Sequence, residues 1–159
     1  MNKKTKRILA LLVYLLLIFL PLIVFLVFPM PSKRETWRDL SVMLGFVGLS
    51  IAGLQFLPTA RIPFLSDVFD LDGVYNAHHI LSVLSVLMVF LHPVLLLVNN
   101  PYTLLLLNPI TAPWRAQAGI IGLAALVLIT ITSVLWKEVT LDYNAWHSVH
   151  DLMARGIAV

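Results

Sequence analysis

The amino-acid sequence opens with an apolar segment that is long enough to cross a lipid bilayer. Ile8 to Phe28 is an uncharged run of 21 residues, and about 20 apolar residues in a helix span the roughly 30 Å hydrocarbon core of a membrane. Inside that core only helices and closed barrels satisfy their own backbone hydrogen bonds. A chain built from such segments is therefore restricted to very few folds.

Further segments of the same kind follow, and the composition agrees with them. Of the 159 residues 60% are hydrophobic and 12% are charged, and the mean hydropathy is +0.93, whereas a soluble domain carries about 25% charged residues. We expect an all-α, polytopic transmembrane helix bundle with about five spans present of an expected six. The five spans are predicted at residues 8–28, 40–57, 74–98, 115–136 and 143–159, with a short interfacial stretch at 104–107.

The basic residues at the start of the chain predict its orientation. Lys3, Lys4, Lys6 and Arg7 directly precede the first span, and cytoplasmic flanks of spans are enriched in Lys and Arg. Residues 1–7 are therefore expected to form a cytoplasmic N-terminal basic segment, and residues 8–159 the transmembrane domain. We expect an integral protein of a plasma membrane or bacterial inner membrane. The basic residues form no stripe with interleaved aromatics, so nucleic acid is not an expected partner.

Histidines on the apolar segments are the candidate functional residues. His78 and His92 are fourteen residues apart on the third predicted span, and His147 and His150 lie on the fifth. At about 100° and 1.5 Å per residue, fourteen residues return a side chain to within roughly 40° of its direction, about 21 Å further along the helix. The two rings thus share a face at two depths, and imidazoles in membrane-spanning segments tend to mark function.

Bis-histidine ligation of b-type haem is the chemistry that this pattern favours. The chain has no cysteine, which excludes thiolate ligation and iron–sulfur clusters. We expect His78 and His92 to be haem iron ligands, and His79 to be the weaker alternative to His78, because its ring would lie roughly 140° from the face of His92. Spacing alone does not choose between His147 and His150. The alternative for any of these residues is a histidine that hydrogen-bonds between helices or extends to the membrane interface.

The linked motifs resemble those of the ferric reductase-like transmembrane domain, which NADPH oxidases and bacterial haem reductases share. The resemblance covers roughly residues 40 to 155. Its matching stretches are His78-His79-Ile-Leu with Leu-His92-Pro93, Asn108-Pro-Ile-Thr-Ala-Pro-Trp-Arg115-Ala-Gln-Ala-Gly119, Thr132-Ser133, and Tyr143-Asn-Ala-Trp146-His-Ser-Val-His150-Asp-Leu-Met-Ala154. The last stretch is similar to the start of the family's fifth span and favours His150 over His147 as the ligand.

The resemblance implies a six-helix bundle that holds two b-type haems between its third and fifth spans. The inner haem would be held by His78 and His150. The outer haem would be held by His92 and by a histidine beyond Val159, so the domain is expected to be incomplete at its C-terminus. The sixth span and the domain that binds FAD and NAD(P)H are likewise expected outside these residues, on a missing domain or a flavoprotein partner.

The expected function is transmembrane electron transfer, as the membrane haem part of a flavin- and NAD(P)H-dependent ferric reductase or NADPH oxidase-like oxidoreductase. One alternative is a haem-binding membrane subunit that receives electrons from quinol or a separate flavoprotein. An alternative of another class is a proton- or metal-conducting membrane protein, whose histidines serve as relay groups or transport ligands.

Overall fold

The protein is helical along its described length. The computed structural model describes residues 2–28, 35–60, 62–135 and 142–158, and within these ranges it has helices and no strand, which confirms the all-α prediction. The long helices are α1 (Lys3–Val27), α2 (Thr36–Leu54), α5 (Leu71–Asn99), α6 (Trp114–Leu135) and α7 (Tyr143–Ala158). The short ones are α3 (Phe56–Thr59), α4 (Pro63–Ser66) and the 3-10 helix η1 (Pro101–Leu107).

Four of the helices have the length and the composition to cross a membrane, namely α1, α2, α5 and α6. They coincide with the first four predicted spans to within a few residues, although Trp136, the predicted end of the fourth, lies outside the described residues. The fifth predicted span forms α7, which has 16 residues and rises about 24 Å, less than the roughly 30 Å core. Its predicted last residue, Val159, also lies outside the described part. The predicted interfacial stretch 104–107 falls within η1.

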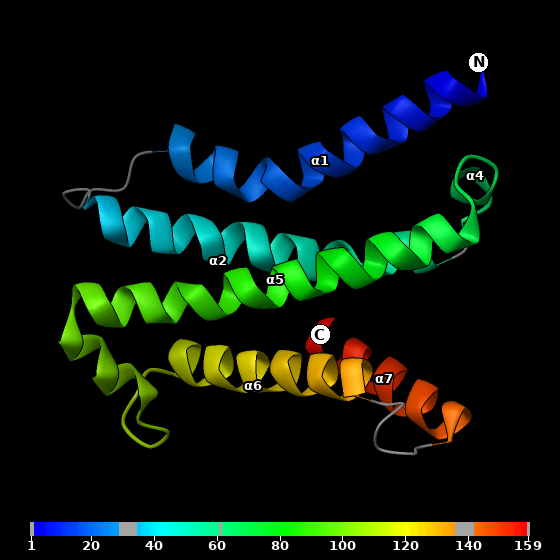
Figure 1. Cartoon of the computed structure of the whole chain (residues 1–159). Coiled ribbons are helices and arrows are strands. Elements are labelled where there is room, and N and C mark those ends of the chain that lie inside the picture. The colour runs from blue at the N-terminus through cyan, green and yellow to red at the C-terminus, as the bar shows by residue number, and fades with distance from the viewer. Residues whose placement is uncertain (1, 29–34, 61, 136–141, 159) are drawn as a thin grey trace. The chain divides into compact units, whose positions relative to one another are not determined.

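The helices belong to two compact units, Met1–Asn99 and Asn100–Val159. In the first unit, α2 lies between α1 and α5 and packs against both (Figure 1). Ile18 of α1 meets Val47 and Ile51 of α2 in the core of this unit. Because α2 has a neighbour on two sides, a larger share of its apolar residues is buried than in α1 or α5.

Small residues of α2 let α5 approach closely. A Cβ added to Gly48 would lie 2.8 Å from Cγ2 of Val89, and a Cβ added to Gly45 would lie 3.2 Å from Cγ and from Nδ1 of the His92 ring. Helices in membranes associate through such close approach, because burial of apolar surface gains little where lipid surrounds it. Gly45 and Gly48 therefore lie at the contact between α2 and α5, whereas a Cβ on Gly53 would meet no described atom within 4 Å.

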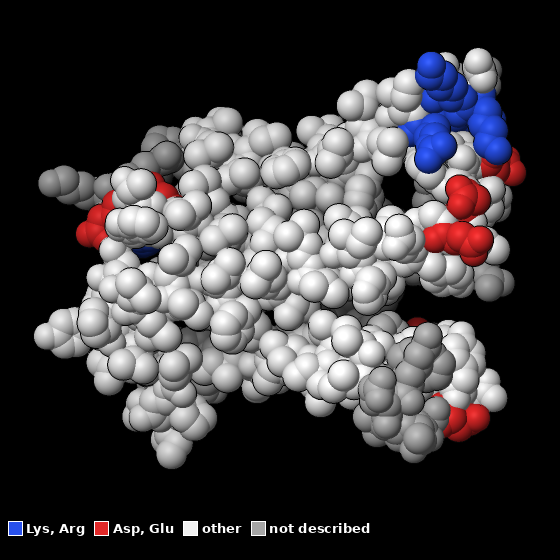
Figure 2. Space-filling view, viewed as in Figure 1, with Lys and Arg blue, Asp and Glu red and all other residues white. Residues whose placement is uncertain are grey.

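Charged side chains gather where α1 and α5 begin, so these two helices start at the same end of the first unit. Figure 2 shows basic side chains of α1 beside acidic ones, and the Arg7 guanidinium lies 5.3 Å from the centre of the Phe69 ring. The carboxylate of Asp70 accepts a hydrogen bond of 2.9 Å from the backbone N–H of Gly73. That bond lowers the pKa of Asp70, as do a bond from its own backbone and the charges of Arg7 and Lys3.

The second unit contains η1, α6 and α7, and α6 packs against both of the others. The ring of Trp146 lies 5.2 Å from that of His150, centre to centre, on the same face of α7. This face carries the candidate ligand of the unit.

Candidate functional site

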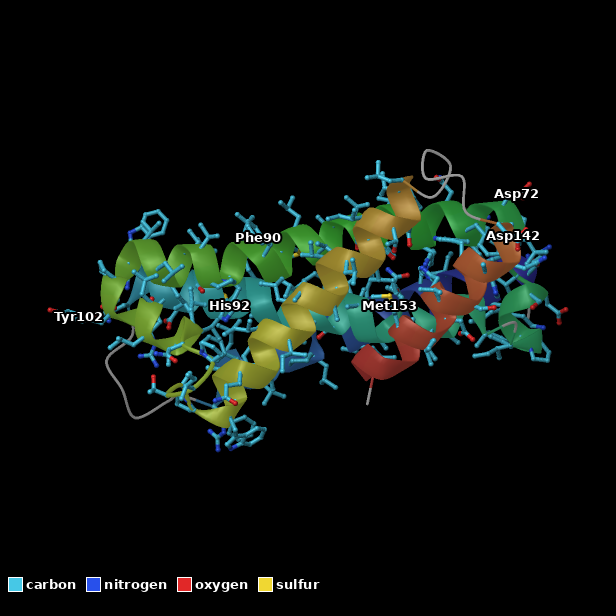
Figure 3. The ribbon with its side chains drawn as sticks, turned by 90° about the horizontal axis from the view of Figure 1, so that it is seen from below. Asp72, Phe90, His92, Tyr102, Asp142 and Met153 are labelled. Atoms are coloured by element: carbon cyan, nitrogen blue, oxygen red, sulfur yellow. The ribbon has the colours of Figure 1, made fainter. Side chains whose placement is uncertain are left out.

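His92 is bound to α2 through both its ring and its backbone. Its Nδ1 lies 2.9 Å from the backbone carbonyl oxygen of Ser41 and 3.0 Å from Oγ of Ser41. The same hydroxyl donates to the carbonyl oxygen of His92 at 2.7 Å, so its only hydrogen is in use. Because a carbonyl oxygen can only accept, Nδ1 of His92 carries the hydrogen. Figure 3 shows His92 directed toward α2, while Phe90 lies on the opposite side of α5.

His78 is bound to α2 near the other end of the helix pair. Its Nδ1 lies 3.0 Å from Oε1 of Gln55, the residue that ends α2. An amide oxygen accepts hydrogen bonds and does not donate them, so Nδ1 of His78 is again the donor. The imidazole of His78 is half-buried and Gln55 is buried, with 6% of its surface exposed.

His150 shows the same arrangement within the second unit. Its Nδ1 lies 2.8 Å from Oγ of Ser133 on α6. That hydroxyl donates its hydrogen to the carbonyl oxygen of Ile129 at 2.6 Å. Its oxygen is therefore left to accept a hydrogen bond from Nδ1 of His150.

The three histidines therefore share one tautomer. With the hydrogen on Nδ1, the unprotonated nitrogen of each neutral ring is Nε2, which carries the lone pair that a metal ion needs. Histidines that ligate metals in proteins nearly always donate their other ring N–H to a carbonyl, a carboxylate or a comparable acceptor, which fixes the ring. Each ring is half-buried beside a neighbouring helix. The donor set fits axial ligation of haem iron.

The two neighbouring histidines are placed differently. His79 and His147 are exposed, and neither has a hydrogen bond from its ring among the residues that the structure describes. The ring of His147 instead lies beside Tyr143, with 6.0 Å between ring centres. Sequence reasoning ranked the same two residues as the weaker candidates.

His78 and His92 divide α5 evenly. His78 lies seven residues after Leu71, and His92 lies seven residues before Asn99. Since fourteen residues of helix rise about 21 Å, a helix that spans the bilayer would hold the two rings at different depths.

His78 and His92 belong to the first unit and His150 to the second, so the pairing of His78 with His150 stays a prediction. Within the described ranges no group of three or more His, Cys, Asp or Glu side chains could hold a metal ion. Haem needs no such group, because its porphyrin supplies four ligands to the iron and two imidazoles suffice for the axial positions.

Sequence reasoning missed the partners of His92 and His78, which are Ser41 and Gln55. A signal for them was present, because Ser41 and Gln55 are fourteen residues apart, the same spacing as His78 and His92. Two antiparallel helices with equal spacings of polar residues can bring both pairs into contact at once. Read alone, each residue resembles an ordinary polar residue near the end of a span.

The apolar helices and the three histidines that hydrogen-bond to neighbouring helices define the class of protein. It is an integral membrane protein of several helices with histidines at its helix contacts. The sequence model of the family described as ferric reductase like transmembrane component matches residues 44–159. The chain belongs to this family, which is generally associated with haem and points to transmembrane electron transfer. No curated protein and no solved structure shows significant similarity to the chain.

Proposed function

We propose that this protein transfers electrons across a membrane through b-type haem, with His78 and His150 as the axial ligands of an inner haem and His92 as a ligand of an outer one. The observation that carries the proposal is the shared state of the three rings. In each of them Nδ1 is hydrogen-bonded to a neighbouring helix, which makes Nε2 the nitrogen that carries the lone pair in the neutral ring.

The haem, when bound, supplies the one-electron chemistry, and the protein's part is to hold and orient it. Ser41, Gln55 and Ser133 orient the three rings through their Nδ1 atoms. The apolar surfaces of the spans exclude water, and ligand identity, hydrogen bonding and burial are the means by which a protein sets a haem potential.

With the N-terminus in the cytoplasm, His78 lies toward the cytoplasmic side and His92 toward the outer side of α5. Electrons would then enter from NAD(P)H through a flavin on another domain or a separate flavoprotein. They would leave toward an acceptor on the far side.

Paired histidine variants test the inner site. His78→Ala should remove the inner haem, whereas His79→Ala, its exposed neighbour, should retain most of it, as measured by the ratio of haem absorbance to protein. His150→Ala and His147→Ala form a second matched pair with the same expectation. Equal haem content in all four variants would contradict the ligand assignment.

The same preparation separates the proposal from the conducting alternative. A haem protein is coloured as purified, and its spectrum changes on reduction with dithionite. A colourless wild-type protein whose histidine variants alter proton or metal flux into vesicles would favour a conducting role.

A further inference from the structure

We propose that α2 presets both histidines of α5 as ligands, and that Gln55 is the positioning residue that holds the hydrogen of His78 on Nδ1. The inference rests on the proposed function, because it concerns ligands of the same haems. It assigns a role to a helix that carries no ligand itself.

The register of the helix pair is the first observation. Ser41 meets His92 at one level, and Gln55 meets His78 at another. Both spacings are fourteen residues, about 21 Å along each helix. One antiparallel register of α2 on α5 therefore satisfies both rings, and a shift of α2 along α5 would release both.

Burial is the second observation. The buried polar side chains of the described residues are Ser41, Gln55 and Ser85, with 0%, 6% and 2% of their surfaces exposed. Two of these three are the partners of the histidines. A polar group costs free energy when it leaves water, unless a hydrogen bond compensates, and the bond between Oε1 of Gln55 and Nδ1 of His78 supplies part of that compensation.

The two anchors differ in kind. The acceptor for His78 is a side-chain oxygen, Oε1 of Gln55, which a substitution removes. The acceptor for His92 includes the backbone carbonyl of Ser41, which every substitution at that position leaves in place. Substitution of Gln55 should therefore change the tautomer of His78, whereas substitution of Ser41 should leave the tautomer of His92 unchanged.

The hydrogen bond to Gln55 also bears on redox chemistry. An acceptor on Nδ1 makes Nε2 a more basic ligand. A more basic ligand stabilises ferric more than ferrous iron, so the bond lowers the reduction potential of the haem that His78 holds.

The first test needs no haem. In free histidine the hydrogen resides mainly on Nε2, so removing the acceptor should move it there. We would label the histidines of the full-length, haem-free chain with ¹⁵N and assign His78 by comparison with His78→Ala. The wild type and Gln55→Glu, which keeps an acceptor oxygen, should show His78 protonated on Nδ1. Gln55→Met, which keeps the volume, should show it protonated on Nε2.

Gln117→Met on α6 is the matched control. The amide of Gln117 donates to the carbonyl oxygen of Ala112 at 2.9 Å and, among the described residues, to no histidine. Its removal should leave the signals of His78 and His92 unchanged. A His78 that is protonated on Nε2 in the wild type, or whose tautomer is the same in Gln55→Met, would overturn the inference.

The second test uses the haem-loaded protein. The haem that depends on His78 is identified by its loss in His78→Ala. Its midpoint potential should rise in Gln55→Met. A rise of about 59 mV corresponds to a tenfold change in the ratio of oxidised to reduced haem at a fixed potential. In Gln55→Glu it should equal the wild-type value or be lower. An unchanged potential in Gln55→Met, with haem retained, would count against the role of Gln55.

The two tests keep the inference apart from the proposed function. If the wild type binds no haem, the proposed function fails, while the tautomer of His78 still supports or overturns the role of Gln55.

A further pair of variants tests the anchor of His92 on the same helix. Ser41→Ala should leave His92 protonated on Nδ1. Its control is Ser50→Ala, which should do the same, because among the described residues the hydroxyl of Ser50 bonds only the carbonyl oxygen of Phe46. A change of tautomer in Ser41→Ala would contradict the assigned role of the backbone carbonyl.

Discussion

A single missing side chain makes room for the ring of His92. Gly45 faces that ring, and a Cβ on it would stand 3.2 Å from both Cγ and Nδ1 of the imidazole. That distance is closer than ordinary van der Waals contact, so either the ring or α2 would have to move. The ring is held on its Nδ1 side by Ser41, and its freedom to move away is therefore limited.

Gly45→Ala should displace the ring of His92 and weaken or abolish its binding of haem. Overpacking of a tight contact costs about 1–3 kcal/mol, which should appear as a lower midpoint in thermal unfolding in detergent. Absorbance spectra of the purified variant would show the loss of the haem that depends on His92. Gly53→Ala is the control on the same helix, because its added methyl group would meet no described atom within 4 Å. A Gly45→Ala protein with wild-type haem content and stability would refute the close fit.

At the scale of elements, the start of α5 depends on the carboxylate of Asp70, which accepts from Gly73 N–H in the first turn. A carboxylate at a helix N-terminus also interacts favourably with the helix dipole. The helix that carries His78 thus begins at a charged cap beside the basic residues of α1.

The contribution of this cap should depend on pH. The pKa of Asp70 is lowered in the folded protein, so the cap stabilises the fold above the usual aspartate pKa of about 3.9 and loses its effect as the pH falls through the lowered value. Asp70→Ala should therefore speed amide hydrogen exchange in the first turn of α5 at pH 7, and the difference from wild type should vanish in acid. Asp67→Ala, an exposed aspartate three residues earlier, should have little effect. The reverse pH dependence would contradict this role of Asp70.

The helices themselves could be predicted from the sequence, because length and apolarity define a span without reference to its neighbours. The ends of α2 and α5 differ from the predicted ends by a few residues, since helices extend into the polar flanks, as α2 does at Thr36. In the fifth predicted span, Asp151 interrupts the apolar run, so the length of the helix could not be predicted from apolarity. The helix that forms there, α7, has 16 residues.

The candidate site could be predicted only in part. The histidines stand out because imidazoles are rare in apolar segments. Their acceptors, Ser41 and Gln55, belong to a different helix, and their identity depends on the register of α2 against α5. That register is set by close packing at positions such as Gly48. The spacing of small residues in the sequence is compatible with several registers of the two helices.

At the scale of the whole molecule, the topology of the first unit follows from its contacts. α1 and α5 begin at one end, where Arg7 lies over Phe69. At the opposite end α5 finishes beside the start of α2, where Asn99 donates to the carboxylate of Glu35 at 3.2 Å. With the N-terminus in the cytoplasm, as proposed, the end where α1 and α5 begin would lie on the cytoplasmic side and the opposite end on the outer side.

The chain has no cysteine, so single cysteines report its orientation directly. Asp67→Cys should react with a membrane-impermeant maleimide only from the cytoplasmic side, in inverted vesicles. Asn99→Cys should react only from the outer side, in intact cells or right-side-out vesicles. Labelling with the two sides exchanged would show that the N-terminus is external.

The order of helices along the chain has a consequence for biosynthesis. The α2–α5 pair lies wholly within the first unit, so all of its residues leave the ribosome before α6 and α7 do. Two rings of the site, with their hydrogen-bond acceptors, can thus be in place while the remainder of the protein is still being translated. Under the proposed function, haem insertion would begin on a nascent chain in which residues 1–99 are already assembled and the histidine of α7 has not yet been made.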